Sequence, residues 1–266
     1  MEIIDGIAYT GQNNKECIKV VKPSKTAKIQ EGCEIIADEA FKDTNIEEII
    51  FPSTLREIGK YAFNHSATKV LDFSNTNLQV INDYAFSKSL DLEKIILPNS
   101  CEVIKIGAFR VCENLREINL ENTKITKINN LLFSSCINLT DLTLPDTVTK
   151  ISTLPFFSSG LKNLKLSKNL KYFNIGIIAD THISSIALPD NLKGIDTGFY
   201  FYSKNSFRLE EITIGTQNKE VLEEIEKIEK FENIKIVKKD LDYLINENAS
   251  FSEINKFYKN IQKEER

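Results

Sequence analysis

The chain has few of the residues that build flexible segments, with 10 glycines and 6 prolines in 266 residues. Long flexible linkers are therefore not expected, because such linkers are rich in glycine, serine or proline. No apolar run approaches the roughly 20 residues that a membrane-spanning helix needs, so the sequence predicts no membrane insertion. The formal net charge is −4 and no basic stripe stands out, which predicts that nucleic acid is not a partner.

The start of the chain, Met1 to Gly6, has neither the basic region nor the apolar core of a secretory signal peptide. As it stands, the sequence predicts a cytoplasmic protein. A cell-surface or secreted location follows instead if a leader was removed before this chain was made. The sequence leaves both alternatives open.

What the sequence does contain is a repeat with a period of 22 to 24 residues. Most copies carry an isoleucine, four further residues and then an aromatic anchor, as in Ile58 to Phe63 and Ile81 to Phe86. A fixed period of this size predicts a solenoid of stacked coils with the anchors in its core. The anchors of the eight copies are Phe41, Phe63, Phe86, Phe109, Phe133, Phe156, Ile178 and Tyr200.

A second pattern follows each anchor, apolar-x-x-apolar-x-apolar, often closed by proline, as in Leu92 to Pro98 and Leu139 to Pro145. The alternation at its end predicts a short strand with one buried face. Proline ends the strand because it cannot donate a hydrogen bond to the ladder. Stacking then places one short parallel strand in each coil and builds a sheet along the solenoid.

Cysteine is scarce, and an odd number at irregular spacings is not a disulfide framework. Zinc would need closely spaced pairs of thiolates, and the sequence has none. Four of the five fall on core positions of the repeat, so we expect free structural thiols. Cys112 and Cys136 occupy the same position of neighbouring copies, and an oxidising compartment could bridge them. The five are Cys17, Cys33, Cys101, Cys112 and Cys136.

The strings IGKYAF at 58–63, INDYAF at 81–86 and LTLP at 142–145 resemble the BspA-type leucine-rich repeat. The resemblance implies a right-handed solenoid with capped ends. It also implies a role, because members of this family are mostly bacterial or protozoan surface and secreted proteins that bind other proteins or host components. An adhesin-like protein is therefore expected from the resemblance.

Four parts are expected along the chain. Residues 1–28 form a β-hairpin cap, because Asp5 to Tyr9 and Cys17 to Val21 are similar to the N-terminal hairpin of the family. Residues 29–214 hold the eight repeats, and 215–239 form an atypical final coil with a helix over 218–231 and a strand over 233–237. Residues 240–266 form a charged helical tail, which either docks on the last coil or binds a partner. The chain is then a monomer or a weak oligomer through this helix.

The sequence contains few residues or motifs that are typical of catalytic or metal sites. The two histidines, His65 and His182, lie about five coils apart, so they cannot share a metal ion or a catalytic triad. Zinc-protease, serine-hydrolase and phosphate-binding motifs are absent from the sequence. We therefore expect neither an enzyme nor a cofactor or metal site.

The exposed face of the strands is the candidate binding surface. Three of its positions are apolar where water is expected, namely Ile50, Val70 and Ile96. One interpretation is strand propensity alone, and the other is a small apolar centre ringed by charge, as in protein-contact patches. The run from Phe199 to Tyr202 is a second candidate if its rings point outward rather than fill the core. The candidate residues are Glu48, Ile50, Val70, Asp72, Lys94, Ile96, Glu117, Asn119, Asp141, Phe199 and Phe201.

The leading hypothesis from the sequence is a non-catalytic scaffold that binds another protein, whose identity the sequence does not reveal. The alternative is an intracellular regulator or inhibitor that binds a bacterial or phage protein.

Overall fold

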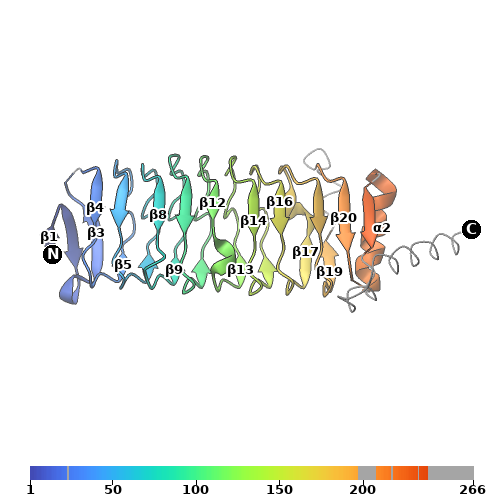
Figure 1. Cartoon of the computed structure of the whole chain (residues 1–266), viewed down its shortest axis with the longest axis horizontal. Coiled ribbons are helices and arrows are strands. Elements are labelled where there is room, and N and C mark those ends of the chain that lie inside the picture. Colours follow the sequence, from blue (N-terminus) through green and yellow to red (C-terminus); the bar gives the residue numbers. More distant parts are fainter. Residues whose placement is uncertain (23, 197–207, 217, 233, 239–266) are drawn as a thin grey trace, which may run out of the picture.

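The computed structural model describes residues 1–22, 24–196, 208–216, 218–232 and 234–238. The described coils stack along one nearly straight axis, with the N-terminal strands at one end and the helix α2 at the other (Figure 1). The solenoid with parallel strands that the repeat predicts is confirmed. The tail at 240–266 lies outside the described residues.

The N-terminal strands close one end of the solenoid. Strands β1 (Glu2–Ile4), β2 (Ile7–Thr10) and β3 (Glu16–Val20) pair antiparallel, with the short 3-10 helix η1 (Gln12–Asn14) between the last two. Strand β3 then pairs parallel with the first coil. The side chains of Ile7, Tyr9 and Cys17 are buried, so this segment covers the end of the core.

Two ladders of parallel strands run along the solenoid. The long-strand ladder consists of β4 (Thr26–Lys28), β6 (Glu48–Ile50), β8 (Val70–Asp72), β10 (Lys94–Ile96), β12 (Glu117–Ile118), β14 (Asp141–Thr143), β16 (Asn163–Lys165), β18 (Ser185–Ala187), β20 (Glu211–Ile214) and β21 (Lys235–Lys238). Its pairing is interrupted, because β6 and β8, β12 and β14, and β16 and β18 are not paired as ladder neighbours.

The short-strand ladder was not predicted from the sequence. It consists of β5 (Ile35–Ile36), β7 (Glu57–Ile58), β9 (Val80–Ile81), β11 (Val103–Ile104), β13 (Lys127–Ile128), β15 (Lys150–Ile151), β17 (Tyr172–Asn174) and β19 (Gly194–Asp196). Most of these strands have only two residues, which is too short for an alternating pattern to be recognised. The expected one strand per coil is thus corrected to two.

A turn segment around each anchor forms the third side of the coil. Its amides donate to the next coil, as Phe63 does to the Ala85 carbonyl at 2.7 Å and Phe86 to the Ala108 carbonyl at 2.8 Å. These bonds require a left-handed backbone two residues before and after the anchor, with φ between 53° and 61°. The non-glycine residues in this conformation are Glu39, Asp43, Tyr61, His65, Tyr84, Lys88, Val111, Leu131, Ser135, Leu154, Ser158 and Asp180.

The aromatic anchors stack as one column through the core. Ring centroids of successive anchors from Phe41 to Phe156 lie 4.9 to 6.3 Å apart, and the rings are tilted by 8 to 15°. All six rings are fully buried. Offset stacking of this kind adds about 0.5–1.5 kcal/mol per pair beyond burial.

The cysteines belong to the same core. Cys112 and Cys136 lie beside the aromatic column, where their thiols donate to the carbonyls of Phe86 and Phe109 at 3.1 and 3.0 Å. Ser89 makes the same contact through its hydroxyl, to the carbonyl of Phe63 at 2.7 Å. Burial raises the pKa of Cys136 to about 12. All five thiols are free and buried.

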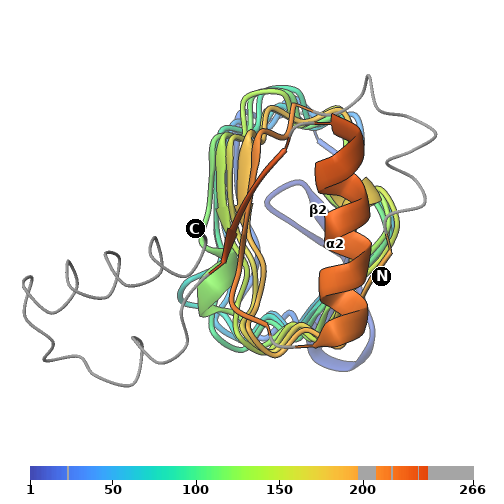
Figure 2. The same ribbon diagram turned by 90° about the vertical axis from the view of Figure 1, so that its right-hand side faces the viewer.

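The helix α2 (Lys219–Glu232) and strand β21 form the last described turn. The side chain of Asn218 begins the helix by accepting from the amide of Glu220 at 2.9 Å. Viewed down the axis, α2 lies across the coil from the long-strand ladder (Figure 2). Val221 and Ile225 are buried against the core, so the helix takes the place that a short strand and a turn segment have in earlier coils.

The aromatic column predicts a large effect of a single truncation. Phe86→Ala should lower the free energy of unfolding by about 3–5 kcal/mol, because it removes a buried ring and two stacking partners. Val70→Ala, at a 47% exposed position, is the control and should cost less than about 1 kcal/mol. Denaturant melts of the two variants would contradict the core assignment if their losses were equal.

Burial of the thiols predicts their reactivity. The folded protein should react slowly with a thiol reagent at pH 8, because raised pKa values keep Cys101 and Cys136 in the unreactive thiol form. The unfolded protein should react at all five positions, with thiolate forming near the ordinary pKa. Mass spectrometry would follow the labelling. Rapid labelling of the native protein would contradict the prediction, because it would show that the core around the cysteines opens in solution.

Candidate protein-binding surface

The outward face of the long-strand ladder carries the candidate residues, and the strand register places them in two columns. Lys94 is paired with Val70 on one side and Glu117 on the other, and Asp141 is paired with Asn163. In the neighbouring column, Ile96 is paired with Asp72. The register within β8 to β12 and within β14 and β16 therefore agrees with the alignment of repeats. The candidate residues along this face are Glu48 and Ile50 in β6, Val70 and Asp72 in β8, Lys94 and Ile96 in β10, Glu117 in β12, Asn119 directly after β12, and Asp141 in β14.

An apolar centre lies toward the N-terminal end of this face. The side chain of Ile50 is 61% exposed and that of Val70 is 47% exposed, whereas Ile96 is half-buried. Buried neighbours such as Leu71 and Ile95 point to the core from the same strands. Alternation along each strand thus forces these three side chains outward, where the described residues leave them partly uncovered.

Charged groups border the apolar centre. The Lys94 ammonium lies 2.5 Å from the carboxylate of Glu117, and both side chains remain largely exposed. Asp141 accepts hydrogen bonds from Thr140 at 2.5 Å and Asn163 at 2.6 Å. These two bonds, that of Thr140 first, lower the pKa of Asp141, so its carboxylate stays ionised. The rim therefore carries fixed charges of both signs.

The ladder breaks next to this rim because Asn119 leaves the strand conformation. Its backbone adopts φ −89° and ψ 54°, and the 3-10 helix η2 (Leu120–Asn122) follows. The Asn119 side chain accepts from the Leu97 amide at 2.7 Å and donates to the Leu97 carbonyl at 2.9 Å. It replaces the ladder bonds that a third strand residue would make, so its amide is already engaged within the fold.

A groove of about 460 Å³ opens at this break. It is lined by Lys94, Ile95, Ile96, Arg116, Glu117, Ile118, Asn119, Glu121 and Asp141. Two of its polar residues, Arg116 and Glu121, were not among the candidates from the sequence. The available signal was the spacing of apolar positions, since Leu120 and Ile125 are separated by one residue more than Leu97 and Cys101. That extra residue is accommodated by η2.

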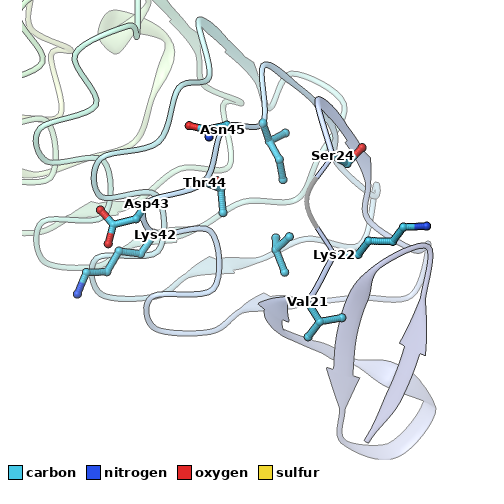
Figure 3. A pocket seen from close by; sticks show the side chains of 9 residues that line it. Val21, Lys22, Ser24, Lys42, Asp43, Thr44 and Asn45 are labelled. Atoms are coloured by element: carbon cyan, nitrogen blue, oxygen red, sulfur yellow. The ribbon is translucent and has the colours of Figure 1, made fainter.

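Two further hollows lie outside this face. One, of about 340 Å³, separates the N-terminal cap from the first coil and is lined by Val20, Val21, Lys22, Ser24, Lys42, Asp43, Thr44, Asn45 and Ile46. Figure 3 shows the side chains of Lys42 and Asp43 pointing away from it. Its lining mixes apolar side chains such as Val20 and Ile46 with polar ones such as Thr44 and Asn45, and these are not the acid, base and nucleophile that a catalytic site combines.

The other hollow contains His65, whose Nδ1 lies 3.5 Å from Asp43 Oδ1. A histidine paired with a carboxylate is part of many hydrolytic sites, but these also need a nucleophile within reach of the histidine. The neighbouring hydroxyl of Ser66 is buried and lies 3.4 Å from that of Ser89. It is thus held in the core rather than offered to His65.

Phe199 and Phe201 lie outside the described residues. Among the residues that are described, three or more His, Cys, Asp or Glu side chains nowhere gather as a metal site would require. No helix in the described part of the chain is long and apolar enough to cross a membrane.

Comparison with known proteins agrees with this architecture. The model of the BspA type leucine-rich repeat region matches residues 14–122 and 79–207 with six copies. The structure is similar to a leucine-rich repeat protein from Bacteroides ovatus, with a TM-score of 0.63 and 21% sequence identity over 89% of this chain and 67% of that one. A leucine-rich cell surface protein from Faecalibacterium prausnitzii gives a TM-score of 0.56 and 16% identity, over 81% of this chain and 55% of that one.

These likenesses show the shared fold, and the chain spans about two thirds of the first protein and about half of the second. A search of the curated proteins found no match. The family model covers more than half of the chain, between residues 14 and 207. The chain therefore belongs to the BspA-type leucine-rich repeat family.

Proposed function

We propose that this protein is a non-catalytic scaffold that binds another protein through the long-strand ladder. The observation that carries the proposal is the exposure of Ile50 and Val70 at the centre of a rim with both signs of charge. Strand propensity alone also favours β-branched residues here, but an interface gains further from burying a 61% exposed isoleucine. The charged rim would then set orientation and specificity.

The extent of the surface agrees with a contact longer than the apolar centre. Three coils at about 4.8 Å per step span roughly 10 Å, which is too little for a stable interface of about 800 Å² per partner. The groove at β12 shares Lys94, Ile96 and Glu117 with this surface and extends it toward β14. We therefore include it in the surface, with Arg116 and Glu121 available for polar contacts to a side chain that enters the break.

An adhesin-like role is the form of this function that the family favours. One of the similar structures is described as a cell surface protein. That description applies to the Faecalibacterium protein, and we extend it to this chain as part of the proposal. The partner would then be a protein on another cell or in its matrix.

The apolar centre gives the first test. Ile50→Asp together with Val70→Asp should keep the fold, because both side chains are exposed, and should weaken partner binding at least tenfold through the cost of burying two carboxylates. Immobilised wild-type and variant proteins would be compared for the proteins that each retains from host-cell and bacterial extracts. Affinities for a retained protein would then be measured by calorimetry.

The matched control is Ile137→Asp, an identical change at a 54% exposed isoleucine outside the two columns. It should bind like the wild type. The proposal fails if the double variant retains every protein that the wild type and the control retain, or if the wild type retains none above an uncoated matrix. Thermal melts of all three proteins would confirm that they are folded.

A further inference from the structure

The outward-facing residues of the short-strand ladder change from mostly apolar to basic halfway along the solenoid. The column considered is the residue that precedes the buried residue of each strand. In the N-terminal half this column holds Ile35, Glu57, Val80 and Val103, as the strand register shows. In the C-terminal half the same position holds Lys127, Lys150 and Tyr172. The strands β13, β17 and β19 follow one another along the same side of the solenoid (Figure 1).

Lys127 and Lys150 lie directly opposite each other. They are register partners in β13 and β15, and both side chains are exposed. Like charges opposite each other in a ladder are destabilising. Elsewhere lysines of neighbouring coils meet acids, as Lys94 meets Glu117 at 2.5 Å and Lys168 meets Asp146 at 2.6 Å. Within the described residues, no carboxylate comes within ion-pair distance of Lys127 or Lys150.

Tyr172 continues the column as an exposed ring. Its side chain is 67% exposed, the largest exposure of any aromatic residue among the described ones. The ring lies across Gly194 of the next coil, where a Cβ atom would come within 3.0 Å of Cδ1 and 3.2 Å of Cε1. The absence of a side chain at position 194 thus gives the ring a support, and its other face is open to solvent.

Two further lysines flank the ring. Lys171 and Lys193 precede the register partners Tyr172 and Gly194, and the Lys193 amide donates to the Lys171 carbonyl at 2.7 Å. Neither side chain makes an ion pair within the part of the chain that the structure describes. A supported aromatic face therefore continues a column of lysines, and the ring and its supporting glycine are each preceded in sequence by one more. All four lysines lack an ion-pair partner among the described residues.

From this arrangement we infer that the C-terminal half of the short-strand ladder binds an anionic polysaccharide running along the solenoid axis. Carboxylate or sulfate groups would lie over Lys127, Lys150, Lys171 and Lys193, and the apolar face of a sugar ring would stack on Tyr172. The site is separate from the long-strand surface and does not depend on it.

The charge balance favours a polysaccharide over a nucleic acid. The whole chain carries a formal charge of −4, and Asp146, Asp190 and Asp196 lie in the same coils as the lysines. A nucleic acid has a phosphate on every nucleotide and needs a broad basic surface. A polymer with an acidic group on some of its sugars carries less charge and fits a narrow lysine column between acids.

The test is titration of the full chain with polygalacturonate and with heparin, which offer carboxylate alone and sulfate with carboxylate. We expect saturable binding of at least one. Lys127→Gln with Lys150→Gln should weaken it about thirtyfold, since each of the two lost contacts is worth roughly 1 kcal/mol. The double change should also reduce the slope of log K against log salt by about one per lysine. Tyr172→Ala should weaken binding severalfold and Tyr172→Phe should not.

The matched control is Lys162→Gln with Lys165→Gln, the same charge change at exposed lysines of the long-strand ladder. It should bind like the wild type. The inference is overturned if neither polymer binds, if the control loses as much affinity as the first pair, or if Tyr172→Ala has no effect. Equal affinity for oligothymidylate would also overturn it, because charge alone would then explain the binding. Binding of Ile50→Asp/Val70→Asp should be unchanged.

Discussion

The hydrogen bonds between coils impose the constraint on which the rest of the structure depends. They hold neighbouring coils about 4.8 Å apart, so each side chain lies on its counterpart one repeat away. The phenylalanine rings accordingly stack at 4.9 to 6.3 Å, and the serine and cysteine positions beside them donate to anchor carbonyls. A column of the core can hold only residues that pack against the residue at the same position of the next coil, such as phenylalanine on phenylalanine or cysteine beside serine. This requirement gives the sequence its repeat.

The same constraint explains how much the sequence could predict. The sequence assigns Phe86, Leu71 and Ile95 to the core, and it assigns Lys94 and Val70 to one outward column. It can do so because residues at the same position of successive repeats lie next to each other in the structure. The extra residue between Leu120 and Ile125 marks an irregular coil, but the groove itself depends on the backbone of Asn119, which the spacing does not specify. The left-handed conformation of Val111 and Leu131 was equally hidden, because neither residue type favours it and only the bonds to adjacent coils stabilise it.

A solenoid of this kind has separate faces along one axis. Each coil contacts only its neighbours, so a change on one face is felt within one or two coils. The long-strand ladder combines exposed apolar side chains with ion pairs such as Lys94 to Glu117. The short-strand ladder instead has lysines beside an exposed ring, and these lysines make no ion pair with the residues that the structure describes. The two proposed surfaces would therefore take ligands of different chemistry without competition between them.

The turn segments have an electrical consequence. Three rows of hydrogen-bonded peptide groups run along the turn segments, at the anchor and two residues before and after it. In the anchor row, the Phe41 amide donates to the Ala62 carbonyl, and the amide of the same peptide group, on Phe63, donates to the Ala85 carbonyl of the next coil. This row continues to the carbonyl of Pro155. Peptide dipoles aligned head to tail sum, as they do along an α-helix. The solenoid therefore has a field along its axis, with the negative pole of these rows toward the N-terminus. There the amide of Val20 donates to the carbonyl of Ala40 at 3.1 Å, so the N-terminal cap satisfies the end of one row as well as covering apolar surface.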